Sequence, residues 1–256
     1  MGWLGGVIGG GIGAVIGGPF GAILGAALGA GLSGGEDGAA SGGFTASHRQ
    51  QAVFFTAAFS MAAKMAKADG RVCEQEIAVI NKVCREAMRM DERTHAFAIN
   101  IFNQAKDRPE SFADFAKEFG EMFAHDQQMC GFMLDFLFQI AMADGKLHPR
   151  EEEFLQQARQ AFRVHDSIYA SLYQRHVGLS VSSSVAGLEK YYEILGADSS
   201  ASDSEVKKAY HKKVAEFHPD KIAGKGLPPE FIKFANEQMV QINEAYDAIM
   251  KARKNN

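Results

Sequence analysis

Apolar residues recur at steps of three and four along two segments near the C-terminal end of the chain. The spacing predicts one helix over 203–217 and a second helix that begins at Glu230. Two such apolar stripes can close on each other as an antiparallel hairpin. Pro219 lacks an N–H and disfavours helical geometry at His218, so the first helix is expected to end there. The stripe positions are Val206, Ala209, Tyr210, Val214 and Phe217, then Phe231, Phe234, Ala235, Ile242, Ala245, Tyr246 and Ile249.

The middle of the chain also shows helical periodicity. From about 48 to 176 we find no convincing strand pattern and a single proline, Pro109, before Pro149. A region of this length can bury its own core. Segments 33–47 and 177–187 are rich in small residues and are predicted to be linkers. The predicted fold class is therefore all-α, with a helical bundle at 48–176 and a helical hairpin within 188–256.

The middle region contains an internal repeat. The segment 66–72 reappears 75 residues later as 141–147, and both copies hold an Ala-Asp-Gly corner. Each copy predicts a helix that ends at the corner, and a new helix near the glutamate that follows. The four acidic residues of the two copies could gather around a divalent cation. We favour a structural role, in which each Asp caps a helix and each Gly takes a left-handed conformation. The four residues are Asp69, Glu76, Asp144 and Glu151.

The N-terminal segment is apolar and rich in glycine. Residues 1–35 contain no charged side chain and hold fifteen of the chain's 27 glycines. As a helix, 3–32 would extend about 45 Å, which exceeds the roughly 30 Å core of a bilayer. We predict a membrane-spanning or membrane-embedded helix over 1–32, whose glycine ridge would favour a homodimer. The ridge consists of Gly5, Gly9, Gly13, Gly17, Gly21, Gly25 and Gly29.

Other structures for this segment remain open. A re-entrant hairpin could bend at Pro19, and a soluble helix is a further alternative, although many glycines would destabilise it. A secretory signal peptide is disfavoured because the basic first part and the short apolar core are both missing.

Composition excludes several function classes. The formal net charge is −4, and residues 188–256 hold eleven basic and eleven acidic side chains, so no positive field attracts nucleic acid. Cys73, Cys84 and Cys130 form no Cys-x-x-Cys pair, which argues against a zinc site or a disulfide framework. We find no phosphate-binding loop and no paired nucleophile and base. We therefore expect neither an enzyme nor a cofactor.

The C-terminal region resembles a J-domain, the module of DnaJ-type co-chaperones. The resemblance rests on 191–196 (YYEILG), Ala209-Tyr210, the loop 218–221 (HPDK) and Ala245-Tyr246. It implies that the hairpin docks on a DnaK-type chaperone and triggers ATP hydrolysis. By the resemblance Asp220 pairs with a basic residue of the partner, while His218 and Pro219 shape the loop and Lys221 belongs to the contact. The implied core comprises Tyr192, Leu195, Tyr210, Phe217, Ala245 and Tyr246.

The exposed face of the first hairpin helix is predicted to be cationic. It carries a run of basic residues opposite the apolar stripe, with Lys213 at its border. Such a ridge steers an acidic partner and raises its association rate, although a lysine run can also be a merely solvated face. J-domains commonly have Arg at the place of His211 and a leucine-like residue at that of Lys213. The ridge consists of Lys207, Lys208, His211 and Lys212.

The repeated corners resemble the TerB family, and the order of the three regions resembles the DjlA family of DnaJ-like co-chaperones of the bacterial inner membrane. The resemblance implies a membrane-anchored protein that recruits DnaK through its J-domain. Lysine and arginine near the segment are almost absent, so charge says little of topology. The need for an ATP-dependent partner predicts a single-pass protein whose bulk is cytoplasmic. The alternative is an envelope stress or metal sensor in which the J-domain is secondary.

Overall fold

The computed structural model describes residues 4, 17–31, 46–67, 74–178, 188–217 and 227–254. Every regular element within these ranges is a helix, which confirms the all-α prediction. Two of the helices continue into short π-helical turns, η2 (Val83–Ala87) and η3 (Gln174–Gly178). The α-helices are α2 (Gly18–Gly31), α3 (Ala46–Ala66), α4 (Glu74–Lys82), α5 (Glu92–Lys106), α6 (Phe112–Phe123), α7 (Gln127–Ala141), α8 (Pro149–Ala161), α9 (Asp166–Tyr173), α11 (Glu189–Leu195), α12 (Asp203–Phe217) and α14 (Pro229–Lys254).

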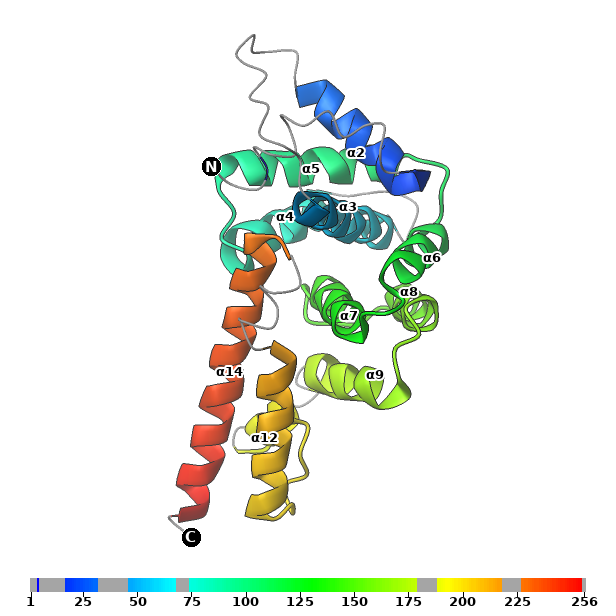
Figure 1. Ribbon diagram of the computed structural model, residues 1–256. Coiled ribbons are helices and arrows are strands. Elements are labelled where there is room, and N and C mark those ends of the chain that lie inside the picture. The colour runs from blue at the N-terminus through cyan, green and yellow to red at the C-terminus, as the bar shows by residue number, and fades with distance from the viewer. Residues whose placement is uncertain are drawn as a thin grey trace.

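Helix α3 is the centre of the bundle. Every residue from Ala52 to Ala63 is buried, because α5, α6 and α7 all pack against this helix (Figure 1). Phenylalanines fill the space between the helices, and the alanines beside them let neighbouring helices approach closely. The buried hydroxyl of Thr56 donates to the carbonyl oxygen of Ala52 at 2.7 Å, so its polar group is satisfied within the helix.

The internal repeat is visible in the helix boundaries. Helix α3 ends at Ala66 and α7 ends at Ala141, while α4 begins at Glu74 and α8 begins at Pro149. Both pairs of boundaries keep the 75-residue offset of the sequence repeat, which confirms the predicted helix–corner–helix units. At the second corner Gly145 has a φ of 87°, the left-handed conformation that glycine adopts readily. The first corner, residues 68–73, lies outside the described residues.

The described part of the N-terminal segment packs on the bundle. Gly18 has a φ of 77°, and α2 begins there before Pro19. One face of α2 is buried against α3, α5 and α6, where the ring of Phe20 stacks on Phe115 with centroids 5.6 Å apart. The amide of Asn100 on α5 donates to the carbonyl oxygen of Ala27 at 3.0 Å. The buried apolar residues of this face are Phe20, Ile23, Leu24, Ala27 and Leu28.

The membrane helix predicted over 1–32 is covered only in part by the described residues. Among the helices of those ranges, none combines the length and the apolar character needed to cross a bilayer. Gly5, Gly9 and Gly13 of the glycine ridge lie outside the described residues, whereas Gly21 is buried and Gly25 is partly buried. The described part of the ridge therefore includes a glycine that is covered by the same chain.

Glu118 ties α2 to α6 and is expected to make this contact depend on pH. Its carboxylate oxygens accept from the backbone N–H of Phe20 at 3.1 and 3.3 Å, and burial raises the pKa of Glu118 to about 7. Because the folded-state pKa lies above the ordinary value, the folded chain holds this proton more tightly than the unfolded chain does. Its contribution to stability is complete below the ordinary pKa and falls as pH rises towards 7.

We expect Glu118→Gln to flatten this dependence of the unfolding free energy on pH, measured by urea unfolding from pH 4.5 to 7.5. The exposed Glu121→Gln should keep the dependence of the unaltered chain. Equal slopes for all three chains would contradict the prediction.

Candidate functional site

Helices α12 and α14 form the hairpin that the sequence predicts. The rings of Tyr210 and Tyr246 stack with centroids 4.2 Å apart, and the hydroxyl of Tyr210 donates to Asn243 Oδ1 at 3.1 Å. Helix α12 spans Asp203–Phe217, the range that the apolar spacing indicates. Val206, Ile242, Ala245 and Ile249 are fully buried between the helices of this unit.

The short helix α11 closes the end of the hairpin away from the loop. Tyr192 and Leu195 of this helix are buried. Arg253, near the end of α14, lies over the ring of Tyr192 at 5.2 Å and donates to its hydroxyl at 2.7 Å. The same guanidinium donates to Asp203 at the start of α12 at 2.7 Å. One arginine thus connects all three helices of the unit, and Tyr210 and Tyr246 are half-buried beside them.

The predicted cationic ridge is exposed on α12. Lys207, Lys208, His211 and Lys212 all project into solvent. Lys213 differs from the expectation of a border position, since its side chain is only 3% exposed. Its ammonium donates to Ser171 Oγ on α9 at 2.7 Å, so this lysine binds the bundle.

The loop that follows the ridge is reached directly from α12. His218, Pro219, Asp220 and Lys221 lie outside the described residues, as does the side chain of Phe217. Helix α12 ends at Phe217 and α14 begins at Pro229, so the segment that contains 218–221 joins the two helices of the hairpin.

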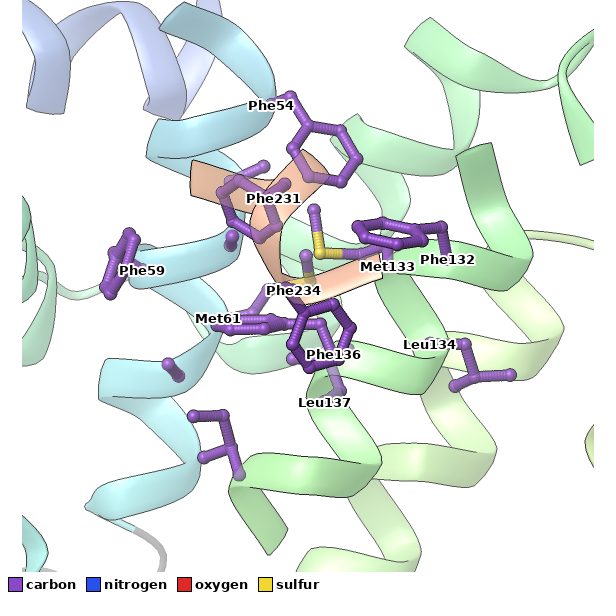
Figure 2. Packing of buried hydrophobic residues seen from close by; sticks show 14 of the residues in the cluster. Phe54, Phe59, Met61, Phe132, Met133, Leu134, Phe136, Leu137, Phe231 and Phe234 are labelled. Carbon is purple, nitrogen blue, oxygen red and sulfur yellow. The ribbon is translucent and has the colours of Figure 1, made fainter. Parts of the chain in front are cut away.

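The start of α14 is embedded in the middle bundle, a feature that the sequence analysis missed. Figure 2 shows Phe231 and Phe234 among the phenylalanines of α3 and α7. The ring centroid of Phe231 lies 4.9 Å from that of Phe54 and 5.3 Å from that of Phe136. Phe234 meets Phe132 edge-on at 5.4 Å. The two regions therefore share one hydrophobic core, and α14 runs from that core to the far end of the hairpin (Figure 1).

A buried ionic cluster lies beside this junction. Asp135 on α7 is fully buried and accepts from Arg175 Nη2 and, at 2.7 Å, from His176 Nε2 in η3. Burial alone would raise the pKa of Asp135, but the nearby Arg175 guanidinium and the His176 hydrogen bond outweigh it and lower the pKa. Burial lowers the pKa of His176, against the opposing effect of Asp135. No sequence pattern predicts this cluster, because Asp135 lies 40 residues from Arg175 and 41 from His176.

The acidic residues of the second Ala-Asp-Gly corner form hydrogen bonds within the corner and at the start of α8. Asp144 accepts from the backbone N–H of Lys146 at 2.9 Å and contacts His148 Nε2 at 3.0 Å. Glu151 accepts from the backbone N–H of His148 at 3.0 Å, at the start of α8. Asp69 and the side chain of Glu76 lie outside the described residues, and among those described no three acidic, histidine or cysteine side chains gather as metal ligands would.

Comparison with known proteins identifies both regions. Residues 55–174 match the family described as Tellurite resistance protein TerB, and residues 190–256 match the family described as DnaJ domain. The chain is 32% identical over 232 residues to the Co-chaperone protein DjlA of Photobacterium profundum, covering 83% of each protein. It is 33% identical over 229 residues to the protein of the same name from Coxiella burnetii, covering 82% of this chain and 83% of the relative.

No solved structure matches the chain. The two family matches follow each other in the order in which the bundle and the hairpin occur, and the relatives cover both of them. The chain therefore belongs to the DjlA family of co-chaperone proteins and carries a TerB domain followed by a DnaJ domain.

Proposed function

We propose that this J-domain co-chaperone recruits a DnaK-type chaperone and stimulates its ATP hydrolysis through the loop 218–221. The observation that carries the proposal is the exposed ridge of Lys207, Lys208, His211 and Lys212 on α12, which leads directly to that loop. These four side chains are exposed, so an acidic partner surface can approach without displacing any part of the fold. Electrostatic attraction of this kind accelerates association, while short-range contacts determine how long the complex lasts.

The chain acts on the ATPase of its partner and performs no chemistry of its own. The role of the hairpin is to hold the loop in one orientation, because both of its helices are packed and α14 is anchored in the TerB domain. Asp220 would meet a basic residue of the partner, and His218 and Pro219 would set the shape of the loop.

We further propose that residues 1–32 anchor the protein in the bacterial inner membrane, with α2 released from its packing on the TerB domain and the bulk of the chain in the cytoplasm. The absence of charge in 1–35 and the four-residue glycine repeat support this role. A glycine ridge also supports pairing of two copies within the membrane. Recruitment of a DnaK-type chaperone to the membrane surface would then follow from the anchor.

The test is a single-turnover measurement of ATP hydrolysis by a purified bacterial DnaK. Full-length chain in vesicles is expected to accelerate hydrolysis, with an effect that saturates as the concentration of the chain rises. Raising the salt concentration should increase the concentration needed for half of the effect, because the ridge attracts the partner through screened charges. A folded full-length chain that leaves the rate unchanged would contradict the proposed function.

A further inference from the structure

A largely apolar groove runs between the TerB domain and the exposed side of α12. Its volume is about 330 Å³, and its lining comes from α7, α9 and α12. Phe132 and Leu172 are buried at its floor, and Ile168 forms a partly exposed wall. On the other side the rim is formed by Lys212 and Ala215, both of which are exposed. The groove therefore belongs to both domains at once.

The position of the groove is fixed by contacts on either side of it. Lys213 donates to Ser171 Oγ at 2.7 Å, which holds α12 against α9. Lys212, the neighbouring residue on α12, is part of the cationic ridge and of the groove rim. Ala215 on the same rim precedes His218 by three residues. A protein that docks on Lys212 and reaches the loop must lie next to the groove.

We propose that the docking surface for the DnaK-type chaperone extends across this groove onto the TerB domain. The inference rests on the proposed function and adds a second contact to it. The partner would place an acidic surface on the ridge and an apolar side chain between Ile168 and α12. An apolar hollow beside a cationic rim suits such a surface, because the ridge attracts acidic groups and the groove buries apolar area.

The two parts of this surface would contribute in different ways. Exposed lysines mainly accelerate association and are sensitive to salt, whereas a side chain buried in a hollow mainly slows dissociation. The TerB domain would then contribute to binding of the DnaK-type chaperone, because Ile168 and Phe132 belong to it and not to the hairpin.

A groove-filling variant tests the proposal without disturbing the fold. A Cβ added at Gly131 would meet only Ile168 Cγ2, at 3.9 Å, which is an ordinary contact. Glycine within a helix is also less favourable than a residue with a side chain. Gly131→Leu is therefore expected to fold and to occupy the groove. We expect it to raise the half-saturating concentration for stimulating DnaK about tenfold, as for loss of one buried contact, with the maximal rate unchanged.

A second variant and a control complete the experiment with the full-length chain. Ile168→Asp places a negative charge on the wall of the groove and should also raise the half-saturating concentration for stimulating DnaK. Met122→Asp makes a similar change on α6, at an apolar side chain that is 44% exposed and lies outside the groove, and should have no effect. An unchanged half-saturating concentration in both groove variants would overturn the inference and leave the proposed function intact. Stronger stimulation by these variants would have the same meaning. Failure of the unaltered chain to stimulate would instead contradict the proposed function.

Discussion

Full-length chain carrying His218→Gln is expected to lose its stimulation of a DnaK-type ATPase while keeping the stability of the unaltered chain. The expected loss follows from the proposed role of the loop, which acts on the partner and not on the hairpin. The helices on either side are held by contacts of their own. These include the stacked rings of Tyr210 and Tyr246 and the hydrogen bonds of Arg253. Single-turnover hydrolysis and urea unfolding, measured on the same preparation, check the two parts of the prediction.

His148→Gln is the matched control. His148 is exposed and belongs to the second Ala-Asp-Gly corner, where it contacts Asp144. The control is expected to stimulate DnaK as the unaltered chain does. Full activity of His218→Gln would refute the role of the loop. If His148→Gln, but not His218→Gln, abolished a phenotype that depends on this protein in cells, the alternative of a TerB-based sensor would be favoured over the co-chaperone function.

The local structure of the hairpin could be predicted because its signals are local. Three- and four-residue steps define an apolar stripe whatever lies around it, and Pro219 ends a helix by its own geometry. The predicted range of α12 therefore agrees with the structure. The internal repeat could be predicted for the same reason, since the sequence of each copy determines where its own helix ends, at Ala66 or at Ala141.

The junction between the domains could not be predicted from such patterns. Phe231 and Phe234 fit the apolar stripe of a hairpin helix, and the spacing does not say which helices cover them. The structure places them against Phe54, Phe132 and Phe136, far away in the sequence. The burial of Lys213 could not be predicted for the same reason, because its hydrogen-bond partner Ser171 lies 42 residues away on another helix.

The N-terminal segment shows a different limit. An apolar face satisfies a bilayer and a protein core equally well, because both remove it from water. Phe20, Ile23 and Leu24 are buried against the TerB domain, although the same residues contributed to the prediction of a membrane helix. The hydrogen bond between Asn100 and Ala27, which adds a specific polar contact to this packing, has no signal in the sequence of 1–35.

The shared core has a functional consequence. Helix α14 carries the hairpin at one end and is seated in the TerB domain at the other (Figure 1). Any rotation of the hairpin relative to the bundle would have to withdraw two phenylalanines from their contacts. The orientation of the cationic ridge and of the groove beside it is therefore set by the TerB domain.

Replacing Phe231 by alanine is expected to destabilise both domains together. The ring is fully buried and lies within 6.2 Å, centroid to centroid, of four phenylalanines of α3 and α7. Removing such a side chain typically costs about 3–5 kcal/mol, through lost transfer energy and the cavity that remains. This is a large part of the roughly 5–15 kcal/mol by which a domain is usually stable. Urea unfolding of the full-length chain measures the loss.

Hydrogen exchange distinguishes a shared core from two independent domains. If the domains share Phe231, amides of α3 and α11 should both exchange faster in the Phe231→Ala chain, because the same cavity weakens both units. Val240→Ala is the control on the same helix, since that side chain is 54% exposed and its loss should change stability by no more than about 0.5 kcal/mol. Faster exchange in α11 with α3 unchanged would mean that the hairpin unfolds without the bundle. The TerB domain could not then fix the orientation of the ridge, and the groove between α9 and α12 would lose its basis as a docking surface.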